Sequence, residues 1–406
     1  MWSGNLKSAI ASLRLNKWRS FLTMLGVIVG VSSVVTVVSL GEGLKQQVVG
    51  QINQLGEDVL TVRSGRITSG GVGNAELNIL ALLNTSTLTD DDVATIAELP
   101  KVAATVPINF VTNTASSENR RQDNLYVIGT TGDLDEMLNQ KVAYGTFFEN
   151  DSTDTNQVVI GSRVAAQLLR RLNPVGHTLQ ISGQEFIVQG VLEQSAGGLL
   201  SIAQTDFNSA ILMPLEASKK LTGDRTNILQ ILVRSEDPDL DQVVADIEKS
   251  VSKNHSGNVD FSVLKQEELL SIASGVVNVI TAFITAIAAV SLLVGGIGIM
   301  AIMLVSVSER TREIGIRKAV GATNRQILNQ FLLEGLVLSV GGGIIGILIA
   351  LAANGLIRLY TNLDPVVNLR VLIFAAIVSI GVGIIFGVAP AAKAARKHPI
   401  DALRNG

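Results

Sequence analysis

Four long apolar stretches constrain the fold of this chain more than any other feature of its sequence. The first covers residues 21–40, a run of 20 residues without a charged side chain, and the others lie in the last third of the chain. We predict that these three cover residues 276–307, 331–358 and 369–390. Because about 20 apolar residues in a helix span the roughly 30 Å hydrocarbon core of a bilayer, each stretch is long enough to be a transmembrane helix.

The first stretch has a competing interpretation as a cleaved signal peptide, whose apolar segment is usually about 7–15 residues long. This stretch is longer, and Ser39-Leu40-Gly41-Glu42 is a poor match to the small residues of a cleavage site. We therefore predict that it remains in the mature protein as a membrane anchor.

Charged residues predict which way the helices cross the membrane. The segments 1–20, 308–330 and 391–406 together hold 13 Lys and Arg residues and only three acidic ones. Residues 41–275, in contrast, hold 17 basic and 30 acidic residues. By the positive-inside rule we predict a cell-membrane protein with both termini in the cytoplasm. The region 41–275 and a short loop at 359–368 then lie outside, while 308–330 forms a cytoplasmic loop and 391–406 a cytoplasmic tail.

The first 20 residues have an amphipathic pattern. Apolar Leu6, Ile10, Leu13 and Trp18 alternate with basic residues at helical spacing. This pattern is typical of a helix that lies in the membrane interface, which we predict on the cytoplasmic side. The alternative is that these residues are only the solvated start of the first transmembrane helix.

The region 41–275 alternates between strand and helix patterns, which predicts an α+β domain. Its two ends share a strand–helix–strand texture, so we predict two α+β halves that flank an inserted β-rich subdomain at about 131–215. We expect strands at 58–63, 101–113, 124–130, 157–160, 178–182, 184–192, 209–213, 230–234 and 259–263, and helices at 88–99, 162–172 and 240–251. The chain has no cysteine, so this domain must rely on its hydrophobic core instead of disulfides.

No catalytic, cofactor-binding or metal site can be recognised in the sequence. The three histidines, His177, His255 and His398, are far apart, and His398 is predicted to lie across the membrane from the other two. A phosphate-binding motif G-x-x-x-x-G-K-[ST] does not occur. We therefore expect no catalytic residue, no cofactor, no metal and no nucleic-acid partner for this chain.

Small and charged residues inside the apolar stretches have separate interpretations. Glycines cluster at 295–298, 341–346 and 381–387, where small residues four apart allow helices to pack closely in lipid. We predict a packing role for them and no ligand role.

Glu334 is the one acidic residue in a predicted span. A charge inside a membrane often marks function, but Glu334 lies within a turn of the inner edge, so we predict that it anchors the helix at the interface.

The most specific motif is SERTREIGIRKAVGATNRQILNQFLLE at residues 308–334. A second motif, APAAKAARKHPIDALR at 389–404, ends the chain. Together with the segment that opens the first helix, these motifs closely resemble the MacB/FtsX-like (type VII) family of ABC transporter permeases. The resemblance covers all four apolar stretches and the layout of the region between the first two.

The segment 309–320 can form a short helix that ends at GATN, residues 321–324. Such a helix, with mixed charge around an apolar centre, places Arg310, Glu313, Ile314 and Arg317 on one face and suits docking to a partner. The resemblance implies that it is the coupling helix that contacts the ATPase, and the alternative is an ordinary basic loop facing lipid headgroups. The predicted coupling residues are Glu309, Arg310, Arg312, Glu313, Ile314, Arg317 and Lys318.

Some members of this family carry an ATPase domain in front of the first membrane helix, and this sequence does not show one. The resemblance therefore implies a stand-alone, non-catalytic permease that works as a homodimer with a separate ATPase, which binds ATP and Mg. It further implies a membrane-fusion (adaptor) partner and mechanotransmission, in which ATP hydrolysis moves the external domain. The expected result is export of a peptide, antibiotic, lipid-like or other amphipathic substrate.

Two other functions remain open at this point. The chain is alternatively an FtsX-like regulatory subunit that transmits motion to an external cell-wall hydrolase, or a peptide-sensing resistance module. A regulatory subunit is expected to have a smaller external domain without the β-rich insertion, and four membrane helices argue against the sensing module. The sequence does not identify the substrate.

Helical periodicity continues beyond the lipid on both sides of the external domain. Residues 41–55 keep four apolar side chains at spacings of 4, 4 and 3, and residues 264–274 can extend the second membrane helix in the same way. We predict a rigid stalk that connects the membrane helices to the external domain. Its packing residues are Leu44, Val48, Ile52, Leu55, Leu269 and Ile272.

Overall fold

The computed structural model describes residues 17–53, 58–66, 86–117, 120–138, 140–150, 156–194, 206–223, 226–361, 363–399 and 402. The chain divides into two compact units. Residues 1–44 and 277–406 form one, which we call the membrane unit, and residues 45–276 form the other, which we call the sheet unit.

Four long helices in the described residues are apolar enough to cross a membrane, with mean hydropathies between 2.2 and 2.8 in their most apolar windows. They are α2 (Lys17–Asn53), α8 (Gln266–Glu309), α10 (Asn324–Tyr360) and α11 (Leu369–Ala395). The predicted fold class, four membrane helices with a large α+β region between the first and the second, is confirmed. Of the predicted N-terminal amphipathic segment, residues 1–16 lie outside the described residues and residues 17–20 belong to α2.

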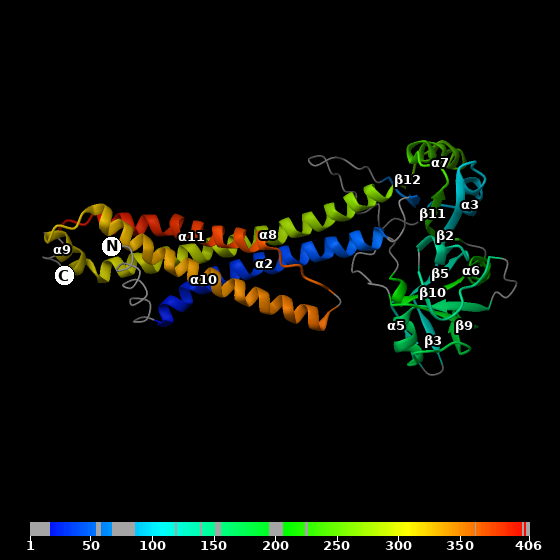
Figure 1. The fold of residues 1–406 in the computed structure, drawn as a ribbon, viewed down its shortest axis with the longest axis horizontal. Helices are drawn as coiled ribbons and strands as arrows, with labels where there is room; N and C mark the ends of the chain where they lie inside the picture. The colour runs from blue at the N-terminus through cyan, green and yellow to red at the C-terminus, as the bar shows by residue number, and fades with distance from the viewer. Residues whose placement is uncertain are drawn as a thin grey trace. The chain divides into compact units, whose positions relative to one another are not determined.

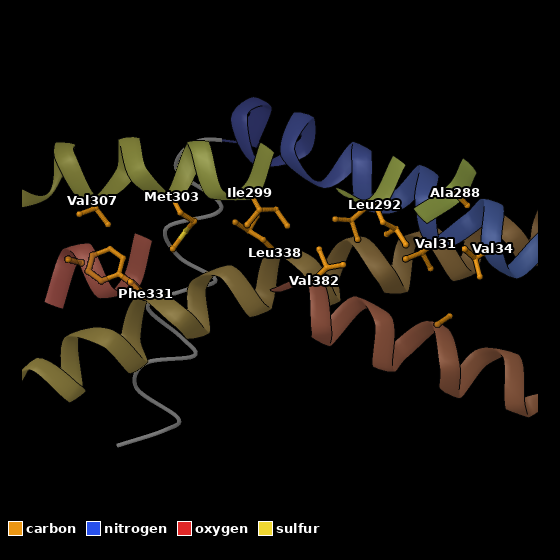
Figure 2. Close-up of a cluster of buried hydrophobic side chains, with 14 of the residues drawn as sticks. Val31, Val34, Ala288, Leu292, Ile299, Met303, Val307, Phe331, Leu338 and Val382 are labelled. Atoms are coloured by element: carbon orange, nitrogen blue, oxygen red, sulfur yellow. The ribbon is translucent and has the colours of Figure 1, made fainter. Parts of the chain in front are cut away.

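The four helices pack around one apolar core in the membrane unit (Figure 1). Figure 2 shows Met303 and Val307 of α8 beside Phe331 of α10, and Leu292 of α8 near Val31 of α2. Helices in lipid gain little from the hydrophobic effect, so close side-chain packing of this kind is what holds them together.

Small residues bring helices close together where α2 meets α8 and where α10 meets α11. A Cβ atom added to Gly295 of α8 would lie 2.6 Å from the carbonyl carbon of Gly26 in α2. Between α10 and α11 the contacts are reciprocal, because a Cβ on Gly343 would overlap Ser379 and a Cβ on Gly383 would overlap Ser339. The predicted packing role of the glycine clusters is confirmed at these positions.

Within its described residues, the sheet unit contains one mixed sheet of twelve strands (Figure 1). Eleven of them follow one another as β12 (Phe261–Leu264), β1 (Val59–Ser64), β11 (Ile228–Ser235), β2 (Val102–Thr112), β5 (Tyr126–Thr130), β10 (Ala210–Pro214), β7 (Gln157–Ile160), β9 (Gln184–Leu192), β8 (Thr178–Ile181), β3 (Ala115–Ser117) and β4 (Arg120–Gln122). The twelfth, β6 (Val142–Gly145), pairs with β9 off this path.

Helices cover the sheet at both of its ends. At the β12 end lie α3 (Asp90–Ala97) and α7 (Leu240–Asn254), and α7 buries Val243, Ile247 and Val251 at a spacing of four residues. This spacing places the three side chains on one helical face, which packs on the sheet. The remaining helices of the unit are α4 (Leu134–Leu138), α5 (Ser162–Val164), a π-helical turn at Ala165–Leu169, a 3₁₀ turn at Phe207–Ser209 and α6 (Leu215–Thr222).

The strands of the predicted β-rich insertion, residues 131–215, join the same sheet as the flanking halves. β10 pairs in parallel with β5, which precedes residue 131, and its five residues are all buried. The short strands β3 and β4 also precede residue 131, yet β3 pairs with β8 near the far end of the sheet. The two predicted α+β halves share this sheet. Strand β11 of the second half pairs antiparallel with β1 on one side and with β2 on the other, and both of these belong to the first half.

Candidate functional site

The predicted coupling segment folds into a separate short helix, α9 (Thr311–Ala319), between α8 and α10 (Figure 1). Gly321 follows the end of this helix, and its φ of +107° lies in a region that glycine adopts without strain. The next helix begins at Thr323, whose side chain accepts a hydrogen bond from the amide of Gln326, while the Gln326 side chain accepts one from the Thr323 amide. This reciprocal capping box fixes the turn between α9 and α10.

One side of α9 packs into the membrane unit. Ile314 is fully buried and belongs to the same apolar core as Ile327 and Phe331 of α10. Gly315 lies against the tail, since a Cβ added there would be 2.8 Å from the Cβ of Ala402. Ile314 therefore holds α9 in place, and it is not available to a partner.

Lys318 ties the same side of α9 to the end of α11. Its Nζ donates hydrogen bonds to the carbonyl oxygens of Ala395, at 2.5 Å, and Lys397, at 2.8 Å. Carbonyl groups at the C-terminal end of a helix lack partners within the helix and carry partial negative charge, so a lysine stabilises them.

An ion pair between a half-buried arginine and a buried glutamate connects the junction of α8 and α9 to α10. Arg310 Nη1 lies 3.1 Å from Glu334 Oε1, and the Glu334 side chain is only 8% exposed. The sequence-based interpretation of Glu334 as an interfacial anchor did not include this pair, which forms because the α8–α9 junction brings Arg310 to α10. A single acidic residue that follows a loop with five basic residues was the signal that could have suggested this pair.

Removing one member of this pair is expected to destabilise the membrane unit. Glu334→Ala leaves Arg310, whose side chain is 29% exposed, without its carboxylate, and the loss of a hydrogen bond to a charged group typically costs about 1.5–3 kcal/mol. Unfolding of the purified protein in detergent measures the change. The double variant Arg310→Met, Glu334→Leu leaves no unpaired charge and is expected to recover most of the loss. Equal destabilisation by the single and the double variant would contradict a role for the pair.

The opposite side of α9 is exposed and combines charged with apolar residues. It carries Arg312, Glu313, Ile316, Arg317 and Val320, and Val320 is 85% exposed. Arg317 Nη1 donates to Gln330 Oε1 at 2.9 Å. Sequence reasoning missed Ile316 and Val320, although two apolar residues four apart in a charged segment were the available signal. We call these five residues the outer face of α9.

The structure thus divides the seven predicted coupling residues into two groups. Arg310, Ile314 and Lys318 hold α9 against the membrane unit. Glu309, Arg312, Glu313 and Arg317 are exposed. The predicted face shared by Arg310, Glu313, Ile314 and Arg317 is therefore split, since packing turns its apolar centre inward.

The predicted stalk residues lie on α2 and α8. Val48 is 4% exposed and packs in one small cluster with Leu264, Leu269 and Ala273, and Ile272 lies at its edge. Leu44 is half-buried, Ile52 lies within α2, and Leu55 lies outside the described residues. Both α2 and α8 continue without a break across the residues at which the two units are divided.

His255 is the one histidine in the described residues that lies between two carboxylates. Its Nε2 is 3.0 Å from Asp92 and its Nδ1 is 2.6 Å from Asp260. Burial alone would lower the pKa of His255, but the hydrogen bond and charge of Asp92, with Asp260, outweigh it and raise the pKa. Burial would likewise raise the pKa of Asp92, and hydrogen bonds from His255, Asn254 and Thr89 instead hold it below its ordinary value. No group of three side chains that could hold a metal ion occurs in the described part of the chain.

The cluster predicts how stability depends on pH. A raised pKa means that His255 stabilises the fold fully below its unfolded pKa of about 6.5 and loses that contribution as pH rises through the folded pKa. Because folding lowers the pKa of Asp92, this carboxylate stabilises the fold fully above its unfolded pKa of about 4 and loses that contribution as pH falls through the folded pKa. The protein is expected to unfold at a higher temperature at about pH 6 than at about pH 8.5. His255→Gln is expected to reduce this difference and His177→Gln to preserve it. The same pH dependence in both variants would contradict the assignment.

Comparison with known proteins agrees with this architecture. A family model of the MacB-like periplasmic core domain matches residues 20–250, and a model of the FtsX-like permease C-terminal region matches residues 271–399. The chain is 36% identical over 402 residues to the macrolide export ATP-binding/permease protein MacB of Azoarcus sp., covering 98% of this chain and 58% of that protein. It is 34% identical over 410 residues to the pyoverdine export ATP-binding/permease protein PvdT of Pseudomonas fluorescens, covering 99% and 60%.

A solved structure of the periplasmic region of MacB from Actinobacillus actinomycetemcomitans is similar with a TM-score of 0.44 and 16% identity, covering 53% of this chain and 92% of that one. The chain spans about 60% of the length of the two curated relatives.

Proposed function

Because this chain belongs to the MacB/FtsX-like family of ABC transporter permeases, we propose that it is the non-catalytic membrane subunit of an ATP-driven exporter. The ATPase is a separate subunit that binds ATP and Mg. The exporter contains two copies of this chain and an adaptor protein. Two curated relatives are named for export, one of macrolides and one of pyoverdine, which supports export as the function of this family member. We propose a peptide, antibiotic, lipid-like or other amphipathic substrate.

The outer face of α9 is the observation that carries this proposal. Its exposed mixture of Glu313, Arg317, Ile316 and Val320 suits a protein partner, since charged pairs give specificity and apolar side chains fill pockets. The other side of the same helix is fixed to α8, α10 and α11. A force applied by an ATPase to α9 therefore reaches all three helices.

Helices α8 and α2 carry this movement toward the sheet unit. α8 is one helix of 44 residues, and α2 is one of 37. Val48 of α2 packs against Leu269 and Ala273 of α8 beyond the membrane unit, so the two helices support each other there. We infer that they act as a stiff stalk and that movement of the sheet unit drives export.

The distribution of basic residues supports the orientation that this mechanism needs. The segments next to α9 and both ends of the chain are basic, whereas residues 41–275 are acidic overall. We therefore propose that α9 and the termini face the cytoplasm, where ATP is available, and that the sheet unit lies outside.

A second function from the same family is regulation of an external cell-wall hydrolase, and the match of residues 271–399 to an FtsX-like model favours it. The match of residues 20–250 to a MacB-like domain favours export. ATP-dependent efflux from vesicles that contain the complex supports export. Activation of a bound hydrolase without efflux would support regulation.

The purified chain is expected to hydrolyse no ATP, because no phosphate-binding loop occurs in its 406 residues. Adding the partner ATPase is expected to give hydrolysis that depends on both proteins. Phosphate release before and after further purification, with an inactive ATPase variant as control, measures this. Hydrolysis that stays with the chain after every other subunit has been removed would contradict the proposal.

A further inference from the structure

We propose that the pocket between α9 and the first turns of α10 binds one anionic phospholipid from the leaflet that borders α9. The pocket has a volume of about 790 Å³. This size lies within the roughly 300–1,000 Å³ of clefts that hold small ligands. Its walls come from α9, the turn after α9, α10 and Ile384 of α11, all within the membrane unit.

The deep part of the pocket is aliphatic. Leu332, Leu333 and Leu336 of α10 line it together with Ile384 of α11, and Ile384 is exposed. Leu336 lies five residues after residue 331, where the predicted membrane span begins, which is roughly 8 Å along a helix. That depth reaches the hydrocarbon of a bilayer, so an acyl chain fits this part of the pocket.

The shallow part is polar and carries positive charge. Arg317 lines it with the side-chain amides of Gln326, Asn329 and Gln330. Gln330 accepts a hydrogen bond from Arg317 at 2.9 Å and so holds the guanidinium at the edge of the pocket. Among the described residues, no carboxylate lines the pocket. Arginine binds phosphate through two parallel hydrogen bonds, and the amide N–H groups are additional donors.

These two parts match an amphiphile with a phosphodiester and no positive charge. A choline headgroup would bring its cation next to Arg317, whereas a glycerol headgroup leaves the net negative charge of the phosphate. A soluble protein partner does not reach the depth of Leu336 and Ile384 in hydrocarbon, so we favour a lipid over a segment of the ATPase. The inference does not depend on the direction of export or on which side of the membrane α9 faces.

Native mass spectrometry of the full chain tests this proposal. The detergent-solubilised protein is incubated with an equal mixture of phosphatidylglycerol and phosphatidylcholine. The detergent is then removed in the mass spectrometer, and the lipids that stay bound to the protein are counted. We expect one phosphatidylglycerol per chain to be retained at least ten times more often than phosphatidylcholine. Ile384→Trp and Leu336→Trp fill the pocket and are expected to remove the bound lipid, and Arg317→Gln is expected to remove the preference. Leu348→Trp, at an exposed site of α10 outside the pocket, is the control and is expected to retain the lipid.

Three results would overturn the proposal. Equal retention of the two lipids means that the rim does not select the headgroup. Equal loss in Leu348→Trp and Ile384→Trp means that the lipid belongs to the general lipid shell. Ile316, Arg317 and Val320 line the pocket and also belong to the outer face of α9, so release of the lipid when the ATPase binds means that the pocket is part of the subunit interface. Glu313→Lys does not touch the pocket and is expected to leave lipid retention unchanged, so failure of the lipid site and failure of the ATPase contact are distinguishable.

Discussion

Reversing Glu313 to lysine is expected to weaken binding of the ATPase at least about a hundredfold, which corresponds to about 2.7 kcal/mol. Glu313 is exposed on the outer face of α9 and makes no contribution to the buried side of that helix. A like charge placed against a complementary surface costs several kcal/mol, and removal of a central interface residue costs about 2 kcal/mol or more. Because Ile314 and Lys318 continue to hold α9, the membrane unit is expected to stay folded.

Affinity between the purified chain and its ATPase, measured in nanodiscs, tests this expectation together with ATP hydrolysis by the complex. Arg317→Glu is expected to have a similar effect. Asp364→Lys is the matched control, since it reverses a charge that is 74% exposed and whose ion pair with Arg358 is also exposed. Surface pairs of that kind contribute little, so normal coupling is expected in this variant. Unchanged binding and hydrolysis in both α9 variants would remove this helix from the mechanism.

Inserting four glycines after Val48 is expected to abolish export while ATP hydrolysis continues. Val48 is buried against Leu264, Leu269 and Ala273, and the insertion interrupts α2 at this contact. Each glycine lowers helix stability by about 1 kcal/mol relative to alanine, so the helix is expected to break there. A broken stalk dissipates the movement of the membrane helices before it reaches the sheet unit.

Four alanines inserted at the same place are the control, because they add about one turn and keep the helix continuous. This variant is expected to retain more export than the glycine variant at the same rate of ATP hydrolysis. Efflux of substrate from vesicles and phosphate release from the same preparation measure the two activities. Export at the normal rate in the glycine variant would contradict mechanical transmission through α2.

The membrane helices and the main strands were predictable from sequence because their signals are local. Twenty apolar residues without a charge have few alternatives to a membrane helix. The predicted strands at 184–192 and 230–234 correspond to β9 and β11, and the predicted helix at 240–251 corresponds to α7. Thr89 and the acidic residues after it likewise encode the start of α3 through its capping box.

The elements that were missed depend on contacts between distant residues. β3 and β4 have three residues each, too few for a periodic pattern, and β3 is fixed by pairing with β8 about 60 residues later. The predicted helix at 162–172 ends earlier because Arg170 adopts a left-handed conformation after a π-helical turn.

The candidate site shows the same limit. The motif at residues 308–334 predicted where the coupling helix lies. The spacing of residues along α9, however, does not show which side of the helix packs against the membrane unit. The burial of Ile314 and the pairing of Arg310 with Glu334 depend on how α9 folds against α10.

The distance between the two copies of the sheet unit, before and after addition of ATP, tests the central claim most directly. The chain has no cysteine, so Leu172→Cys, at an exposed site, introduces a single attachment point for a spin label in each chain. Pulsed electron paramagnetic resonance on the complex with its ATPase in nanodiscs then gives the distribution of distances between the labels. We expect ATP to shift this distribution, and the Glu313→Lys variant and the glycine insertion after Val48 each to remove the shift. An unchanged distribution in a complex that hydrolyses ATP and exports substrate would contradict transmission from α9 to the sheet unit.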